Sequence, residues 1–144
     1  MPLVYFVDSS FNPVPGGNAY GELAKVDMAL SYHAKWQYLT NAEKEDKIVH
    51  ATSQLDSLDF KGAVVSGTQP LQFPRAMTED TTGDFTVREQ VRRLFRALVQ
   101  QIEYNLNRVG IGMTQYSHGN ESFTPRQDIL CREALQSLML YVRK

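Results

Sequence analysis

Apolar positions along the chain recur at the three- and four-residue spacing of a helix in four separate segments. The strongest pattern covers residues 87–109, where apolar side chains mark one wide face. Earlier segments at about residues 22–33 and 41–58 have the same spacing, and another begins after residue 124. The pattern therefore predicts a mainly α protein, a compact bundle of about four helices.

Two of these segments begin with residues that cap helices. Thr40 and Glu43 predict a capping box, in which the hydroxyl accepts a backbone N–H of the first turn and the carboxylate accepts the N–H of the threonine. Thr124 predicts the cap of the last helix, with Pro125 in the first helical position, where its missing N–H costs nothing.

The regions between the helices predict two further features and a domain boundary. The connection at residues 59–86 is unusually long, and long loops in compact domains are generally functional. Gly110 favours an end to the long helix, after which the alternation of residues 111–116 predicts a short β element. Residues 1–20 are rich in proline and glycine and predict an extended arm before a single helical domain at 21–144.

Composition supports one folded domain and reveals an uneven distribution of charge. The chain has 144 residues, 42% of them hydrophobic, and its apolar runs are too short to span a bilayer. The N-terminus lacks the pattern of a secretory signal. Residues 1–86 hold six basic and eleven acidic groups, a net charge of −5, whereas residues 87–144 hold nine and five, a net charge of +4. We therefore expect two surfaces of opposite sign.

The residue types that usually carry catalysis or bind metals are isolated in this sequence. His33, His50 and His118 lack the close Cys, Asp or Glu neighbours that zinc sites require, and His50 is expected to be a half-buried histidine of its helix. The single cysteine, Cys131, fits a small core residue better than a nucleophile. No phosphate-binding glycine motif and no nucleophile elbow occur. The sequence therefore predicts no catalytic residue, no metal, no cofactor and no enzyme.

One set of charged residues stands out on the long helix. Arg88, Arg92 and Arg96 recur every four residues, and Arg93 lies beside them. Such a stripe could contact phosphates or another subunit, because a guanidinium binds anions through two N–H groups. The alternative is a solvated helix face whose arginines pair with Glu89 and other acidic groups. We favour the solvated face over a nucleic-acid site, and both interpretations remain open at this point.

The order of several short motifs resembles a known family. They are Asn18-Ala19-Tyr20, Trp36, Leu39-Thr40-Asn41-Ala42-Glu43-Lys44, Ala51-Thr52, Leu55-Asp56, Phe60-Lys61-Gly62 and Gln69-Pro70-Leu71-Gln72-Phe73-Pro74-Arg75. This order is similar to the tailed-bacteriophage family often labelled DnaT-like ssDNA-binding protein, whose members resemble head–tail adaptor (connector) proteins. Ala19 replaces the usual serine of the family, and Phe73 replaces its usual tryptophan. The resemblance implies packing roles for Asn18, Tyr20, Trp36, Phe73, Pro74 and Arg75.

The resemblance implies a structural protein of the virion. Such a connector forms a homo-oligomeric ring, commonly twelvefold, that docks on the portal protein, meets a downstream neck or tail protein and can touch passing DNA. It would be made in the host cytoplasm and located in the neck, at the head–tail junction. The alternative is a single-stranded DNA-binding or replication accessory protein. The sequence favours the connector, because a pI near 6.3 suits a general nucleic-acid binder poorly.

Overall fold

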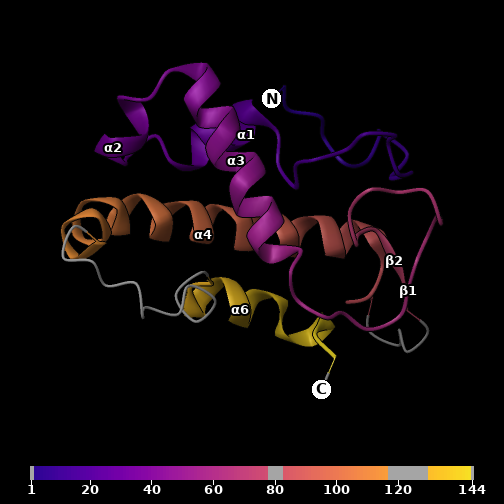
Figure 1. The fold of residues 1–144 in the computed structure, drawn as a ribbon. Coiled ribbons are helices and arrows are strands. Elements are labelled where there is room, and N and C mark those ends of the chain that lie inside the picture. The colour runs from indigo at the N-terminus through magenta and orange to yellow at the C-terminus, as the bar shows by residue number, and fades with distance from the viewer. Residues whose placement is uncertain (1, 78–82, 117–129, 144) are drawn as a thin grey trace.

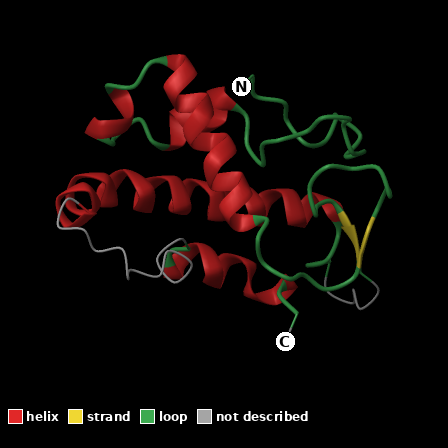
Figure 2. Cartoon of the chain, in the orientation of Figure 1, coloured by secondary structure: helices red, strands yellow, loops and turns green. Residues whose placement is uncertain are grey.

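The computed structural model describes residues 2–77, 83–116 and 130–143, and for residues 108–116 it describes the backbone alone. Within these residues the protein is compact and mainly helical, as predicted, with five α-helices, one 3-10 helix and one small antiparallel sheet (Figure 2). The elements in chain order are α1 (Leu23–Ala29), α2 (Ala34–Gln37), α3 (Asn41–Leu55), β1 (Ala63–Val64), β2 (Arg75–Ala76), α4 (Val87–Tyr116), α6 (Arg132–Leu138) and the 3-10 helix η1 (Met139–Tyr141).

The long helix α4 is the centre of the fold. It runs across the molecule, with α3 crossing it on one side and α6 lying beside it (Figure 1). Leu94, Leu98 and Ile102 of its apolar stripe are fully buried. The wide apolar face predicted for this segment is therefore the side of α4 that packs in the core.

The helix α4 extends further than its sequence suggests. It continues through Gly110 and Gly112 to Tyr116, so the prediction of a β element near residues 111–116 is wrong. A glycine inside a helix costs only about 1 kcal/mol relative to alanine. A strand would need a neighbouring strand for its backbone N–H and C=O groups, whereas a helix satisfies these groups internally. The small sheet of the fold lies instead within the long loop, where β1 pairs with β2.

The predicted capping box at the start of α3 is present. The Thr40 hydroxyl accepts the N–H of Glu43 at 3.2 Å, and the Glu43 carboxylate accepts the N–H of Thr40 at 2.8 Å. The first helix is shorter than predicted, because α1 ends at Ala29. Trp36 lies in α2 and is fully buried.

The end of the chain differs in detail from the prediction. Thr124, the expected cap of the last helix, lies outside the described residues. The described helix α6 begins after Cys131, whose sulfur accepts the N–H of Ala134 at 3.3 Å. Ala134 and Leu138 of the predicted apolar stripe are fully buried against the core.

Residues of the N-terminal segment and of the long loop meet in one aromatic cluster. Phe6 packs edge-on against Tyr20, with ring centroids 4.8 Å apart, and Tyr20 packs edge-on against Phe73 at 6.1 Å. Phe73 in turn contacts Phe60 at 4.7 Å and Tyr141 at 5.8 Å. This cluster fastens both irregular segments of the chain to the helical core.

Candidate nucleic-acid interface

Three arginines lie on one exposed side of α4. Residues four apart in a helix are nearly aligned and are separated by about 6 Å along its axis. Arg88, Arg92 and Arg96 follow this spacing, and all three side chains are exposed. We call these three residues the arginine face. The periodic stripe of the sequence is therefore a feature of the surface.

The arginines of this face differ in their partners. Arg92 forms a two-pronged ion pair with Glu89, at 3.2 and 3.3 Å, and its side chain stays 67% exposed. Arg88 and Arg96 form no ion pair with another described residue. Because the Arg92 side chain stays largely exposed beside Glu89, a phosphate can still reach its guanidinium. All three guanidinium groups are thus accessible to an anion.

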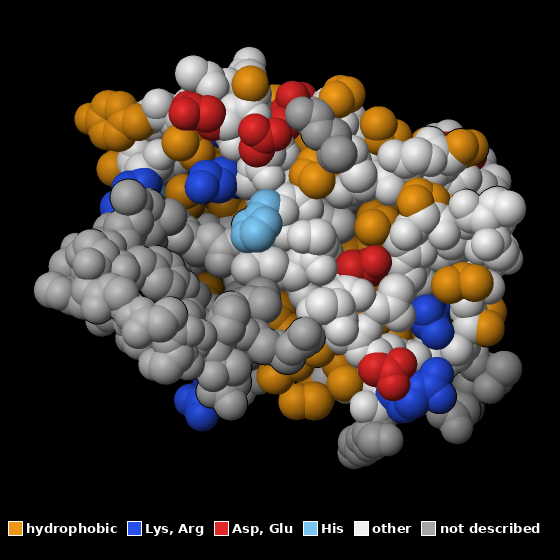
Figure 3. Space-filling view, viewed as in Figure 1, with side chains coloured by type: hydrophobic (Ala, Val, Ile, Leu, Met, Phe, Trp, Pro, Cys, Tyr) orange, Lys and Arg blue, Asp and Glu red, His pale blue; other side chains and the backbone are white. Residues whose placement is uncertain are grey.

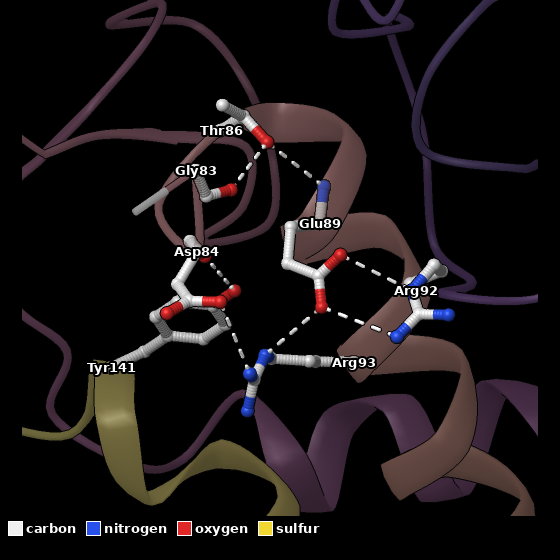
Figure 4. A network of polar contacts seen from close by, with 7 residues as sticks. All are labelled: Gly83, Asp84, Thr86, Glu89, Arg92, Arg93 and Tyr141. Atoms are coloured by element: carbon white, nitrogen blue, oxygen red, sulfur yellow. Dashed lines mark hydrogen bonds and ion pairs between the residues drawn. The ribbon is translucent and has the colours of Figure 1, made fainter. Parts of the chain in front are cut away.

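Arg93 lies apart from the arginine face and is committed to contacts within the chain (Figure 4). Its guanidinium is 3.5 Å from the carboxylate of Asp84 and 3.3 Å from that of Glu89. The same group lies over the Tyr141 ring, 5.9 Å from its centroid. Arg93 therefore connects the start of α4 to the C-terminal 3-10 helix.

The start of α4 is fixed by a cap that the sequence interpretation missed. The Thr86 hydroxyl accepts the N–H of Glu89 at 3.2 Å and donates to the carbonyl of Gly83 at 3.1 Å (Figure 4). Thr86 and Glu89 have the spacing of a capping box, the same signal that identified the start of α3. The Tyr141 hydroxyl donates to the carbonyl of Asp84 at 2.6 Å, which holds the preceding turn in place.

Two residues of the family motifs, Tyr20 and Asp56, form a partly buried polar pair at the end of α3. The Tyr20 hydroxyl donates to the carboxylate of Asp56, which also accepts the N–H of Gln72 at 3.0 Å. Burial raises the pKa of Asp56, although both of these hydrogen bonds oppose the change. Burial and the neighbouring Asp56 carboxylate raise the pKa of Tyr20 well above its ordinary value. This pair holds the long loop against the core.

Arg75 is a buried arginine that binds backbone carbonyls. Its guanidinium donates to the carbonyls of Lys61 at 2.6 Å, Gly62 at 2.8 Å, Gln72 at 3.3 Å and Phe60 at 3.4 Å. Burial, and then the charge of Arg143, lower the pKa of Arg75. An arginine satisfied in this way joins residues 60–62 to residues 72–75 within the long loop and offers little to a ligand.

The remaining motif residues also build the fold. The Asn18 side chain accepts the N–H of Val4 at 2.8 Å and donates to the carbonyl of Pro2 at 3.0 Å. The indole N–H of Trp36 donates to Asp27 at 2.8 Å. Phe73 and Pro74 are buried. The motif residues therefore determine the architecture, and the arginine face lies outside them.

The isolated histidines and the cysteine occupy unrelated places. His50 is exposed on α3, so the expectation of a half-buried histidine is wrong, because Ile48 and Ala51 take the positions that face the core. His33 contacts Asn107 at 3.0 Å, and His118 lies outside the described residues. Cys131 is buried, and burial raises the pKa of its thiol. No cluster of three or more potential metal-binding side chains occurs among the described residues.

The face of the molecule shown in Figure 3 has a mixed surface. Its described lysine and arginine side chains lie in separate small groups among neutral and hydrophobic atoms, and the acidic side chains gather mainly over the upper part of the view (Figure 3). In the parts of the chain that the structure describes, no helix is both long and apolar enough to cross a membrane.

Comparison with known proteins gives one match. Residues 5–120 match the model of the family described as "Putative DnaT-like ssDNA binding protein". Neither the curated proteins nor the solved structures contain a match to this chain. The match covers most of the chain, including the six motif residues and the arginine face. The chain belongs to the family that carries this description.

Proposed function

We propose that this protein binds single-stranded DNA through the arginine face of α4. The observation that carries the proposal is the exposure of Arg88, Arg92 and Arg96 on one side of the central helix, in a chain whose family is described by ssDNA binding. Successive guanidinium groups along a rigid helix can contact successive phosphates of a flexible strand without reading its sequence.

The charge distribution supports a local contact surface. The whole chain has a net charge of −1, which gives little general attraction for DNA. Residues 87–144, which include α4, carry a net charge of +4. We therefore expect binding of modest affinity that depends strongly on a few basic side chains and on salt.

A salt titration tests this function. Binding of a fluorescently labelled oligo-dT is measured by anisotropy for the wild type and for a triple variant in which Arg88, Arg92 and Arg96 are replaced by Gln. For single strands, the slope of log K against log salt changes by about 0.7 per phosphate contact, so the triple variant should lose about 2 from the slope. Its affinity at low salt should fall at least tenfold.

A charge-matched control separates local contact from net charge. Lys25, Lys47 and Arg132 lie on α1, α3 and α6, and their replacement by Gln changes the net charge by the same amount. This control should keep the wild-type affinity and salt slope. Equal losses in both triple variants, or no wild-type binding at low salt, would refute the proposal.

A second candidate function is the phage connector. Two large apolar side chains, those of Met28 and Tyr38, are 77% and 88% exposed. A contiguous exposed apolar patch marks a surface that meets another protein, and the connector requires these two side chains to belong to such a patch. We propose as this second candidate a homo-oligomeric ring docked on a portal protein. Mass photometry of the chain mixed with its portal should show ring-sized complexes that Met28→Ser with Tyr38→Ser disrupts, and a mixture that stays unassembled would contradict it.

A further inference from the structure

An exposed aromatic side chain continues the line of the arginine face. Tyr32 lies in the connection between α1 and α2, and it is 66% exposed. Its hydroxyl donates to the carboxylate of Glu103 at 2.7 Å. Glu103 follows Arg96 by seven residues, which is about 10 Å along α4 and about 20° around it. The ring is therefore anchored two helical turns beyond the last arginine, on the same side of the helix.

The segment that carries Tyr32 is held against α4 by further contacts. His33 contacts the Asn107 side chain at 3.0 Å, and the Lys35 ammonium donates to the carbonyl of Leu106 at 3.2 Å. Together with the bond from Tyr32 to Glu103, these contacts fix the segment at three points. Tyr32 thus presents its ring from a fixed position, which lowers the entropy that a ligand must overcome on binding.

The local chemistry suits a nucleobase better than a phosphate. The Glu103 carboxylate beside the ring repels a phosphate, whereas an uncharged base meets no such penalty. Aromatic side chains that follow a row of basic residues are a common arrangement for binding single strands, because every base has a face that can stack.

We propose that Tyr32 is a base-stacking residue, so that a single strand follows α4 with its phosphates on the arginine face and one base on the Tyr32 ring. This inference rests on the proposed DNA-binding function and adds the group that recognises bases. Stacking of one base is worth about 1–3 kcal/mol, which corresponds to about a 5- to 150-fold change in affinity.

The test compares Tyr32→Ala with Tyr38→Ala. Tyr38 is the matched control because its side chain is also highly exposed, at 88%. Among the described residues, its side chain forms no hydrogen bond or ring contact with α4, unlike that of Tyr32. Two labelled probes are used in the anisotropy assay, oligo-dT and an abasic strand of the same length. We expect Tyr32→Ala to lose about 5- to 150-fold in affinity for oligo-dT with an unchanged salt slope. Its affinity for the abasic strand should equal that of the wild type.

Two further substitutions define the requirement for a ring. Tyr32→Phe should stay within about threefold of the wild type, because the stacking face remains. Tyr32→Leu keeps a large apolar side chain without a ring and serves as the test if the alanine variant does not fold. It should behave like Tyr32→Ala. If Tyr32→Ala and Tyr32→Leu bind oligo-dT like the wild type while the triple arginine variant is impaired, stacking is refuted and the DNA-binding function stands. If the wild type binds neither probe, both proposals are refuted.

Discussion

Buried polar side chains at single positions hold the irregular parts of this protein together. Tyr20 and Arg75 each stand between segments far apart in sequence, and each satisfies groups that would otherwise be buried without a partner. Removing one member of such a set leaves the other unsatisfied, which costs about 1–3 kcal/mol. The aromatic rings around them supply the apolar part of the same attachment.

Replacement of Tyr20 by Phe tests this attachment and its dependence on pH. Near pH 7 the variant should lose about 1–3 kcal/mol in the free energy of unfolding, because Asp56 loses a donor. The pKa of Tyr20 is raised in the folded state, so the unfolded chain releases this proton first as the pH rises above about 10. The stabilisation by Tyr20 is therefore fully present below about pH 10 and is lost above it.

Urea unfolding at pH 7 and at pH 11 measures both effects. The difference between the wild type and Tyr20→Phe should narrow at the higher pH. Tyr38→Phe is the control, since that side chain is 88% exposed, and it should match the wild type at both values. A difference between the wild type and Tyr20→Phe that is constant from pH 7 to pH 11 would contradict this assignment.

At the scale of the helices, the sequence predicts a helix terminus where capping residues mark it, and it does not predict a terminus that lacks such residues. The Thr40–Glu43 spacing located the start of α3, since both partners are three residues apart. Thr86 and Glu89 carry the same signal at the start of α4. The continuation of α4 beyond Gly110 has no such signal, because it depends on tertiary context: among the described residues, no strand pairs with residues 111–116.

The two threonine caps should each stabilise their helix by a similar amount. We expect Thr40→Ala and Thr86→Ala each to lower the free energy of unfolding by about 1 kcal/mol, because each leaves an N–H of the first turn without its acceptor. Thermal unfolding followed by circular dichroism measures the loss. Thr40→Ser and Thr86→Ser, which keep the hydroxyl, should retain most of the stability, and serine variants as unstable as the alanine ones would exclude capping as the cause.

At the scale of the whole molecule, the sequence predicted where the arginines lie and their pairing with Glu89, which Arg92 and Arg93 both form, and not their contacts with distant parts of the chain. Their four-residue spacing placed Arg88, Arg92 and Arg96 on one side of a helix. The partner ring of Arg93 is 48 positions away along the chain, and Glu103 is 71 positions from Tyr32. Contacts over such separations come from tertiary packing, which periodicity alone does not reveal.

Arg92 and Arg93 are neighbours with different roles, and paired substitutions should separate them. Arg93→Gln should lower the free energy of unfolding by about 1 kcal/mol, because it removes a half-buried connection to Asp84 and Tyr141, and should leave DNA binding unchanged. Arg92→Gln should reduce the affinity for DNA severalfold and leave the free energy of unfolding close to that of the wild type. Urea unfolding and anisotropy on the same samples measure both, and identical profiles for the two variants would contradict the division.

The internal use of the motif residues has a consequence for how kinship in this family is understood. Tyr20, Trp36 and Arg75 form hydrogen bonds within the chain that hold its segments together. A relative could retain every one of these signatures and still carry a different outer surface on its central helix. Ancestry detected through these signatures therefore indicates a common scaffold. The biological role of each member depends instead on outer side chains that can diverge.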